Sequence, residues 1–98
     1  MNFVRLNDGK EIKNYGCPYV IAEVNSSHNG DIDIAKKMID AAVEAGCDCV
    51  KFQSWSSKTL YSTSYYQKNP VAKRFVDKLS LTSKELKILA DYCIERGV

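Results

Sequence analysis

The chain has 98 residues, of which 45% are hydrophobic and 27% are charged, and its formal net charge is only +2. These values are typical of one small globular domain, and so weak a charge argues against nucleic acid or a membrane surface as a partner. No apolar run approaches the roughly 20 residues that span a bilayer, and the polar amino terminus lacks the apolar core of a signal peptide. We therefore expect a cytoplasmic protein.

The four cysteines fit packing better than disulfide bonds or a zinc site. No export signal supports disulfides, and Cys47 and Cys49 form a C-x-C pair in place of the C-x₂-C pair of zinc sites. No second pair or nearby histidine completes a metal site. We expect small buried thiols and no metal ligands in this chain. The four are Cys17, Cys47, Cys49 and Cys93.

The first half of the sequence predicts a hairpin followed by a β-α-β unit. Residues 3–13 alternate around a tight-turn sequence at 7–9. Strands are expected over 19–24 and 49–53, with a helix over 33–45 between them. Asp31 or Asp33 is expected to cap this helix, and Gly46 to end it. A helix between two strands implies that the strands are parallel.

The second half predicts a long loop and two helices. The loop runs over 54–69, and a short helix begins at Asn69-Pro70. Thr82 and Glu85 form a capping box for the last helix, which Gly97 ends. The helix that begins at Asn69-Pro70 is expected to carry an apolar stripe of Val71, Phe75 and Leu79. The last helix is expected to have a buried side, formed by Leu86, Leu89, Ala90 and Cys93.

Two parallel strands can neither cover both sheet faces nor close a barrel, which takes about 250 residues. We therefore expect residues 1–98 to be the amino-terminal piece of a larger α/β protein. A small free-standing α+β domain is the alternative.

Charged and amide side chains interrupt both apolar strands, which is unfavourable unless they are paired or bound. Because strand side chains alternate, Glu23 lies on the face of its strand that Lys51 and Gln53 occupy on theirs. One interpretation is a structural Glu23–Lys51 ion pair. The other is a site in which Lys51 meets an anionic group and Glu23 handles a proton or a hydroxyl. Gln53 offers both a donor and an acceptor to a sugar-like hydroxyl.

The polar loop over 25–30 contains further candidates. His28 is the only histidine, and it either organises the loop or acts as a ligand or base. Asn25 has the chemistry to bind a substrate hydroxyl, although such residues also form turns.

Several motifs, in this order, resemble the start of the N-acetylneuraminate (sialic acid) synthase family, which includes the pseudaminic and legionaminic acid synthases. The motifs that carry the resemblance are Ile21-Ala22-Glu23, Ser27-His28-Asn29-Gly30-Asp31, Ala35-Lys36-Lys37, Glu44-Ala45-Gly46 and Val50-Lys51-Phe52-Gln53.

This resemblance implies that the chain forms the first two βα units of a TIM (β/α)₈ barrel, with the rest of the barrel and a carboxyl-terminal antifreeze-like domain lying beyond residue 98. The family condenses phosphoenolpyruvate with an N-acylated amino sugar such as N-acetylmannosamine, releasing phosphate and a nine-carbon 2-keto acid. By matching motif, Glu23 lies near the sugar aldehyde and a metal-bound water, Lys51 contacts phosphoenolpyruvate, and Gln53 approaches the sugar.

The resemblance further implies a divalent metal, typically Mn²⁺, whose ligands lie outside this chain, and a homodimer at full length. The 98-residue chain alone is then expected to be inactive. Asn25-Ser26 and Ser54-Trp55 depart from the usual pattern and leave the sugar open. The alternatives are another phosphoenolpyruvate-condensing barrel, a 3-deoxy-sugar-acid phosphate synthase, or a non-catalytic module that binds an anion or a partner.

Overall fold

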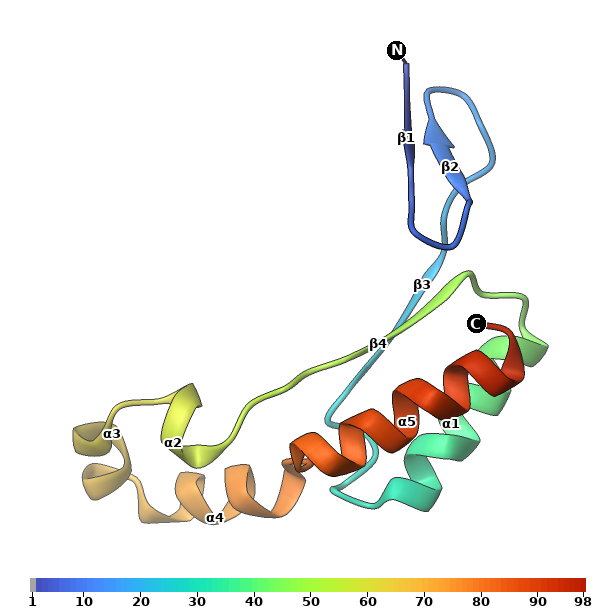
Figure 1. Cartoon of the computed structure of the whole chain (residues 1–98). Coiled ribbons are helices and arrows are strands. Elements are labelled where there is room, and N and C mark those ends of the chain that lie inside the picture. Colours follow the sequence, from blue (N-terminus) through green and yellow to red (C-terminus); the bar gives the residue numbers. More distant parts are fainter. Residues whose placement is uncertain (1) are drawn as a thin grey trace.

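The computed structural model describes residues 2–98, which form a hairpin, a parallel β-α-β unit and a run of four further helices (Figure 1). The elements in chain order are β1 (Phe3–Arg5), β2 (Glu11–Lys13), β3 (Ile21–Asn25), α1 (Ile32–Glu44), β4 (Cys49–Phe52), α2 (Ser57–Leu60), α3 (Thr63–Lys68), α4 (Pro70–Leu79) and α5 (Ser83–Arg96).

The predicted hairpin is confirmed. Strands β1 and β2 are antiparallel, with Phe3 opposite Lys13. Gly9 takes a left-handed backbone angle in the turn, at φ +86°, which glycine adopts without steric penalty. The hairpin projects away from the helices in Figure 1.

The β-α-β unit is confirmed as well, since β3 and β4 pair in parallel with α1 between them. The structure also decides which aspartate caps α1. The Asp31 side chain accepts hydrogen bonds from the backbone N–H groups of Asp33, at 2.8 Å, and Ile34, at 3.3 Å. Gly46 follows the helix at φ +80°, as expected of a residue that ends it.

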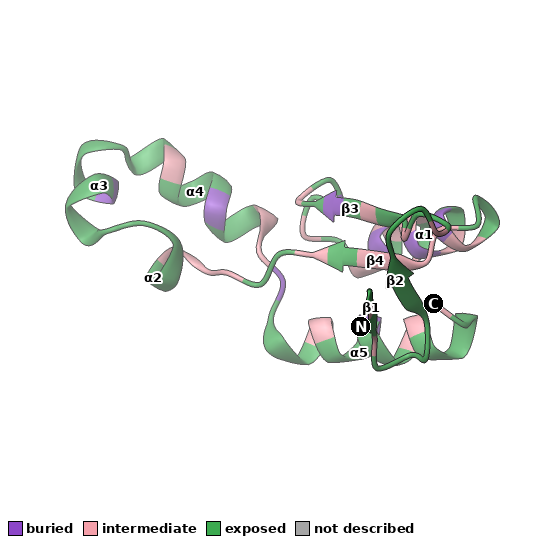
Figure 2. Cartoon of the chain, turned by 90° about the horizontal axis from the view of Figure 1, so that it is seen from above, coloured by how far each residue is buried: buried purple, intermediate pink, exposed green. Residues whose placement is uncertain are grey.

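Helices α1 and α5 lie side by side and cover one face of the β3–β4 sheet (Figures 1 and 2). The opposite face of this sheet is open in the described structure, so polar side chains there remain in water. The main cluster of buried apolar residues consists of Ala35, Ile39, Leu81 and Leu89, against which Val50 and Phe52 of β4 pack.

The prediction of a long loop over 54–69 is wrong, because α2 and α3 lie within it. Each short helix begins with a serine cap. Ser56 and Thr59 form a capping box, and the Ser62 hydroxyl accepts a hydrogen bond from the Tyr65 N–H at 3.2 Å. Segments of four and six residues are too short to give a helical period, so composition alone suggested a loop.

The starts of α4 and α5 agree with the sequence. Pro70 is the first residue of α4, and the α5 capping box is formed by reciprocal bonds of 3.0 and 3.1 Å between Thr82 and Glu85. The predicted apolar stripe of α4 is largely uncovered in the described structure. Val71 and Phe75 are 58% and 59% exposed, because no described element covers that side of α4.

Two burial predictions fail in part. Ala90 was expected on the buried side of α5 and is exposed. Cys17 is exposed and the other three cysteines are only half-buried, although all four thiols are free, as the packing interpretation requires.

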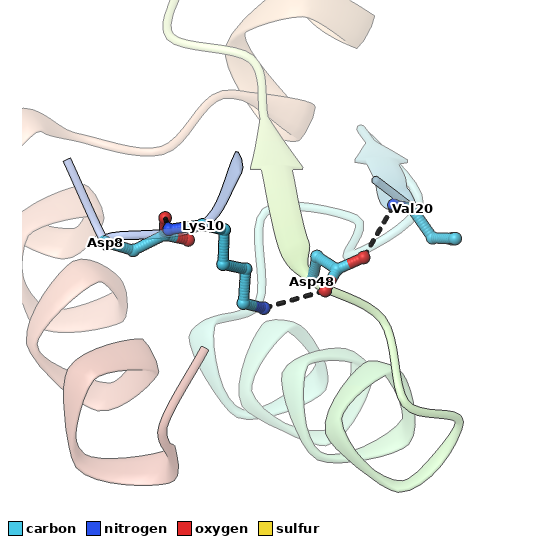
Figure 3. A network of polar contacts seen from close by, with 4 residues as sticks. All are labelled: Asp8, Lys10, Val20 and Asp48. Carbon is cyan, nitrogen blue, oxygen red and sulfur yellow. Dashed lines mark hydrogen bonds and ion pairs between the residues drawn. The ribbon is translucent and has the colours of Figure 1, made fainter. Parts of the chain in front are cut away.

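Asp48, just before β4, links the hairpin to the sheet (Figure 3). One carboxylate oxygen accepts a hydrogen bond from Lys10 Nζ at 2.7 Å, and the other accepts one from the Val20 N–H at 2.8 Å. The Lys10 hydrogen bond, followed by the Val20 N–H, lowers the pKa of Asp48. The sequence did not single out this contact, which joins segments far apart in the chain.

The described chain is extended. Its radius of gyration is 16.5 Å, whereas a compact domain of this length has a radius of about 13 Å. No helix in residues 2–98 combines the length and the apolar character that crossing a bilayer requires.

Candidate functional site

The open face of the β3–β4 sheet brings together two of the predicted site residues. Glu23 and Lys51 are register partners on the two strands, and Lys51 Nζ lies 3.1 Å from a carboxylate oxygen of Glu23. Their side chains are 41% and 60% exposed. An ion pair this exposed contributes ~0–1 kcal/mol to stability. Stabilisation of the fold is therefore a weak explanation for these two charges.

The second carboxylate oxygen of Glu23 is held by the backbone of its own strand. It accepts a hydrogen bond from the Asn25 N–H at 3.1 Å. This contact exists because the strand pairing shifts between Glu23 and Asn25, which leaves an extra residue, Val24, in β3. Bulges of this kind re-aim side chains. The carboxylate is therefore fixed on both sides, by Lys51 and by the bulge.

Asn25 itself takes a left-handed backbone angle, at φ +55°, and its side chain is exposed. The structure thus gives its backbone a role in positioning Glu23. Its predicted contact with a substrate hydroxyl stays a prediction.

Gln53 follows the last residue of β4 and is exposed. Its side-chain oxygen accepts a hydrogen bond from the Trp55 indole N–H at 2.9 Å. Gln53 therefore lies at the carboxyl end of the strand, as predicted, but its acceptor already has a partner. The sequence did not reveal this contact, although residues two apart on an extended segment share a side and this spacing was the available signal.

His28 is separate from the Glu23–Lys51 pair. Its ring is only 2% exposed and packs 6.2 Å from the ring of Phe52, a residue that faces the helices. Nδ1 accepts a hydrogen bond from the Gly30 N–H at 2.9 Å. Burial lowers the pKa of His28, with the Glu85 carboxylate opposing that shift. This geometry agrees with the loop-organising interpretation, and a contact with substrate stays a prediction.

The predicted metal would have its ligands outside this chain, and its presence stays a prediction. Among residues 2–98 no group of three or more histidine, cysteine or acidic side chains is placed to hold a metal ion. Glu23 could be only one of the several ligands that a metal ion needs. The described residues therefore do not make a metal centre by themselves.

The parallel β-α-β unit places the fold in the α/β class of proteins. The candidate site, the Glu23–Lys51 ion pair, lies on the open face of the sheet. The sequence profile of the NeuB family matches residues 38–98. The chain belongs to the NeuB family, as its motifs suggested.

Two curated relatives illustrate the similarity. The N,N'-diacetyllegionaminic acid synthase of Campylobacter jejuni is 50% identical over 44 residues, which cover 45% of this chain and 13% of that protein. The spore coat polysaccharide biosynthesis protein SpsE of Bacillus subtilis is 33% identical over 91 residues, which cover 82% of this chain and 23% of that protein. The chain thus spans less than a quarter of either relative.

The fold has a solved counterpart. The crystal structure of N-acetylneuraminic acid synthetase from Leptospira borgpetersenii, in complex with citrate, superimposes with a TM-score of 0.82 at 25% identity. The match covers 98% of this chain and 32% of that one. The hairpin, the β-α-β unit and the later helices therefore occur together in a sialic acid synthetase.

Proposed function

We propose that this chain forms the first two βα units of a (β/α)₈ barrel that makes a sialic-acid-type sugar acid. The proposed reaction joins phosphoenolpyruvate to an N-acylated amino sugar, consumes one water, and yields a nine-carbon 2-keto acid and phosphate. The observation that carries the proposal is the Glu23–Lys51 pair at 3.1 Å on the open face of a parallel sheet. The relatives whose names are those of synthases support the same reaction class.

Each residue has a role that its chemistry supports. The Lys51 ammonium would bind the phosphate or carboxylate of phosphoenolpyruvate as a point charge. Glu23 would hold the sugar aldehyde end and move a proton at the carbonyl oxygen as the new carbon–carbon bond forms. Gln53, two residues beyond Lys51, would bind the sugar. The electrostatic attraction between these side chains and the substrate would be stronger inside a closed barrel, where water no longer screens the charges.

A divalent cation, with Mn²⁺ as the first choice, remains part of the proposal. Its ligands would come from the rest of the barrel, and it would supply Lewis-acid chemistry at the sugar carbonyl, beside Glu23. We also propose that the complete protein is a homodimer, which sedimentation velocity would test.

The proposal is tested by measuring phosphate release in the complete protein that contains this chain. The assay supplies phosphoenolpyruvate, Mn²⁺ and either N-acetylmannosamine or a doubly N-acylated amino sugar. We expect phosphate release that depends on the amino sugar. A phosphorylated aldose without an N-acyl group serves as the comparison substrate.

Two outcomes would contradict the proposal. Turnover with the phosphorylated aldose alone would assign the protein to the 3-deoxy-sugar-acid phosphate synthases. Absence of sugar-dependent phosphate release with every substrate, in a folded and metal-loaded protein, would favour a non-catalytic binding module.

A further inference from the structure

Trp55 makes a contact that the proposed roles of Glu23 and Lys51 do not use. Its indole N–H donates to the side-chain oxygen of Gln53 at 2.9 Å. Trp55 is the only tryptophan of the chain and is half-buried. It lines a cavity of about 260 Å³ together with Leu81 and Thr82 at the start of α5. The cavity that the indole lines therefore lies between its own segment and the start of α5.

The chemistry of this contact fixes the orientation of the Gln53 amide. An indole N–H only donates, so the group that faces it must be the amide oxygen and not the amide nitrogen. The two ends of a side-chain amide lie on opposite sides of its carbon. When the oxygen is turned toward Trp55, the –NH₂ group is turned away from it. The usual ambiguity between amide oxygen and nitrogen is thereby removed.

We propose that Trp55 is a positioning residue that orients Gln53 so that only its –NH₂ group meets the sugar. The proposal rests on the proposed function, and it narrows the sequence prediction that Gln53 offers both a donor and an acceptor. Gln53 then selects an acceptor oxygen of the substrate. The carbonyl oxygen of the N-acyl group is the strongest neutral acceptor that an N-acylated amino sugar presents.

The first test examines the hydrogen bond itself and needs no turnover. In the ¹⁵N-labelled complete protein, the Trp55 indole resonance is assigned by its loss in Trp55→Phe. We expect faster hydrogen exchange of this indole N–H in Gln53→Ala. Exchange should remain slow in Gln53→Glu, which keeps an acceptor. Equal exchange in the wild type and in Gln53→Ala would overturn the proposal.

The second test examines the consequence for the sugar. Trp55→Phe keeps an aromatic ring and removes the N–H, so we expect the KM for the amino sugar to rise about two- to tenfold. The KM for phosphoenolpyruvate should stay unchanged. Ser54→Ala is the matched control, because Ser54 lines the same cavity and has no side-chain bond to Gln53.

A double-mutant cycle separates positioning from packing. In a Gln53→Ala background, Trp55→Phe should have no further effect on the KM for the amino sugar. Additive losses would mean that Trp55 acts through packing alone, and would overturn the proposal. A wild-type protein without synthase activity would contradict the proposed function and the sugar role with it. The indole exchange would still decide whether Trp55 fixes the amide.

Discussion

Gly30 sits where the loop after β3 meets the end of α4. Its backbone is left-handed, at φ +74°, and a Cβ built there would lie 2.1 Å from the carbonyl oxygen of Lys78. Backbone strain and a backbone clash therefore coincide at one residue of the loop that precedes α1. The approach of Lys78 depends on packing between segments that are distant in the sequence.

Gly30→Ala should lower the free energy of unfolding by about 3 kcal/mol or more, through left-handed strain and overpacking together. Urea denaturation followed by circular dichroism measures the loss. Gly46→Ala is the matched control, because Gly46 has a similar φ of +80° and no atom within 4 Å of the added Cβ. The control should lose only about 1–2 kcal/mol. Equal losses in the two variants would contradict the clash.

His28 makes stability depend on pH. Burial lowers its pKa in the folded protein below the ordinary value of 6.5. Below about pH 6.5 the unfolded chain therefore binds more protons than the folded one, and stability falls as the pH falls. The slope reaches at most ~1.4 kcal/mol per pH unit.

Urea denaturation between pH 5.5 and 7 measures this slope. His28→Asn, which keeps an acceptor for the Gly30 N–H, should flatten the dependence in that range. A proton titration of His28 by NMR with a midpoint at or above 6.5 would contradict the account.

At the scale of the elements, the hairpin depends on a contact made at the start of β4. The Asp48 carboxylate joins Lys10 of the hairpin to the backbone before β3 (Figure 3). Asp48→Asn keeps an acceptor for the Val20 N–H and removes the charge that holds Lys10. We expect the β1 and β2 amides to exchange hydrogen about two- to fivefold faster, with α1 unchanged.

Hydrogen-exchange mass spectrometry measures this difference between elements. Asp91→Asn is the control, because it removes an exposed ion pair with Lys87 on α5, far from the hairpin in sequence. Because the pKa of Asp48 is lowered, its contribution is present above the ordinary value of 3.8 and is lost as the pH falls through the folded pKa. Unchanged hairpin exchange in Asp48→Asn at neutral pH would contradict this role.

The sequence predicted the elements whose signals are local. Turn chemistry placed the hairpin, caps placed α1 and α5, and alternation placed Glu23 beside Lys51. The features that the sequence did not predict depend mainly on strand pairing and tertiary packing. The bulge at Val24 is a property of strand pairing, α2 and α3 are too short for periodicity, and the exposure of Phe75 depends on which elements cover α4.

At the scale of the whole molecule, the open sheet face combines polar site residues with uncovered apolar ones. Ile21, which shares the face of Glu23 by strand alternation, is 51% exposed, and Val20 just before the strand is 47% exposed. Within residues 2–98 the sheet has two strands, so each strand has an unpaired edge. An exposed surface of this kind favours association. The 98-residue chain on its own should therefore form oligomers.

Size-exclusion chromatography with light scattering tests this expectation. We expect a mass above 11.0 kDa that increases with concentration. Ile21→Glu should shift the equilibrium toward the monomer, whereas Ile94→Glu, at a residue of α5 and not of the sheet, should do so less. A monodisperse monomer at millimolar concentration would contradict the expectation.

The proposed function depends on the binding of the anionic substrate by Lys51 beside Glu23, and one kinetic comparison tests this binding. It measures kcat/KM for phosphoenolpyruvate in the complete protein, in the wild type and in Lys51→Ala, with Lys51→Arg retaining the charge. We predict a loss of about 100-fold or more in Lys51→Ala, from removal of a charge-assisted contact, and a smaller loss in Lys51→Arg. A wild-type kcat/KM in folded Lys51→Ala would contradict the account.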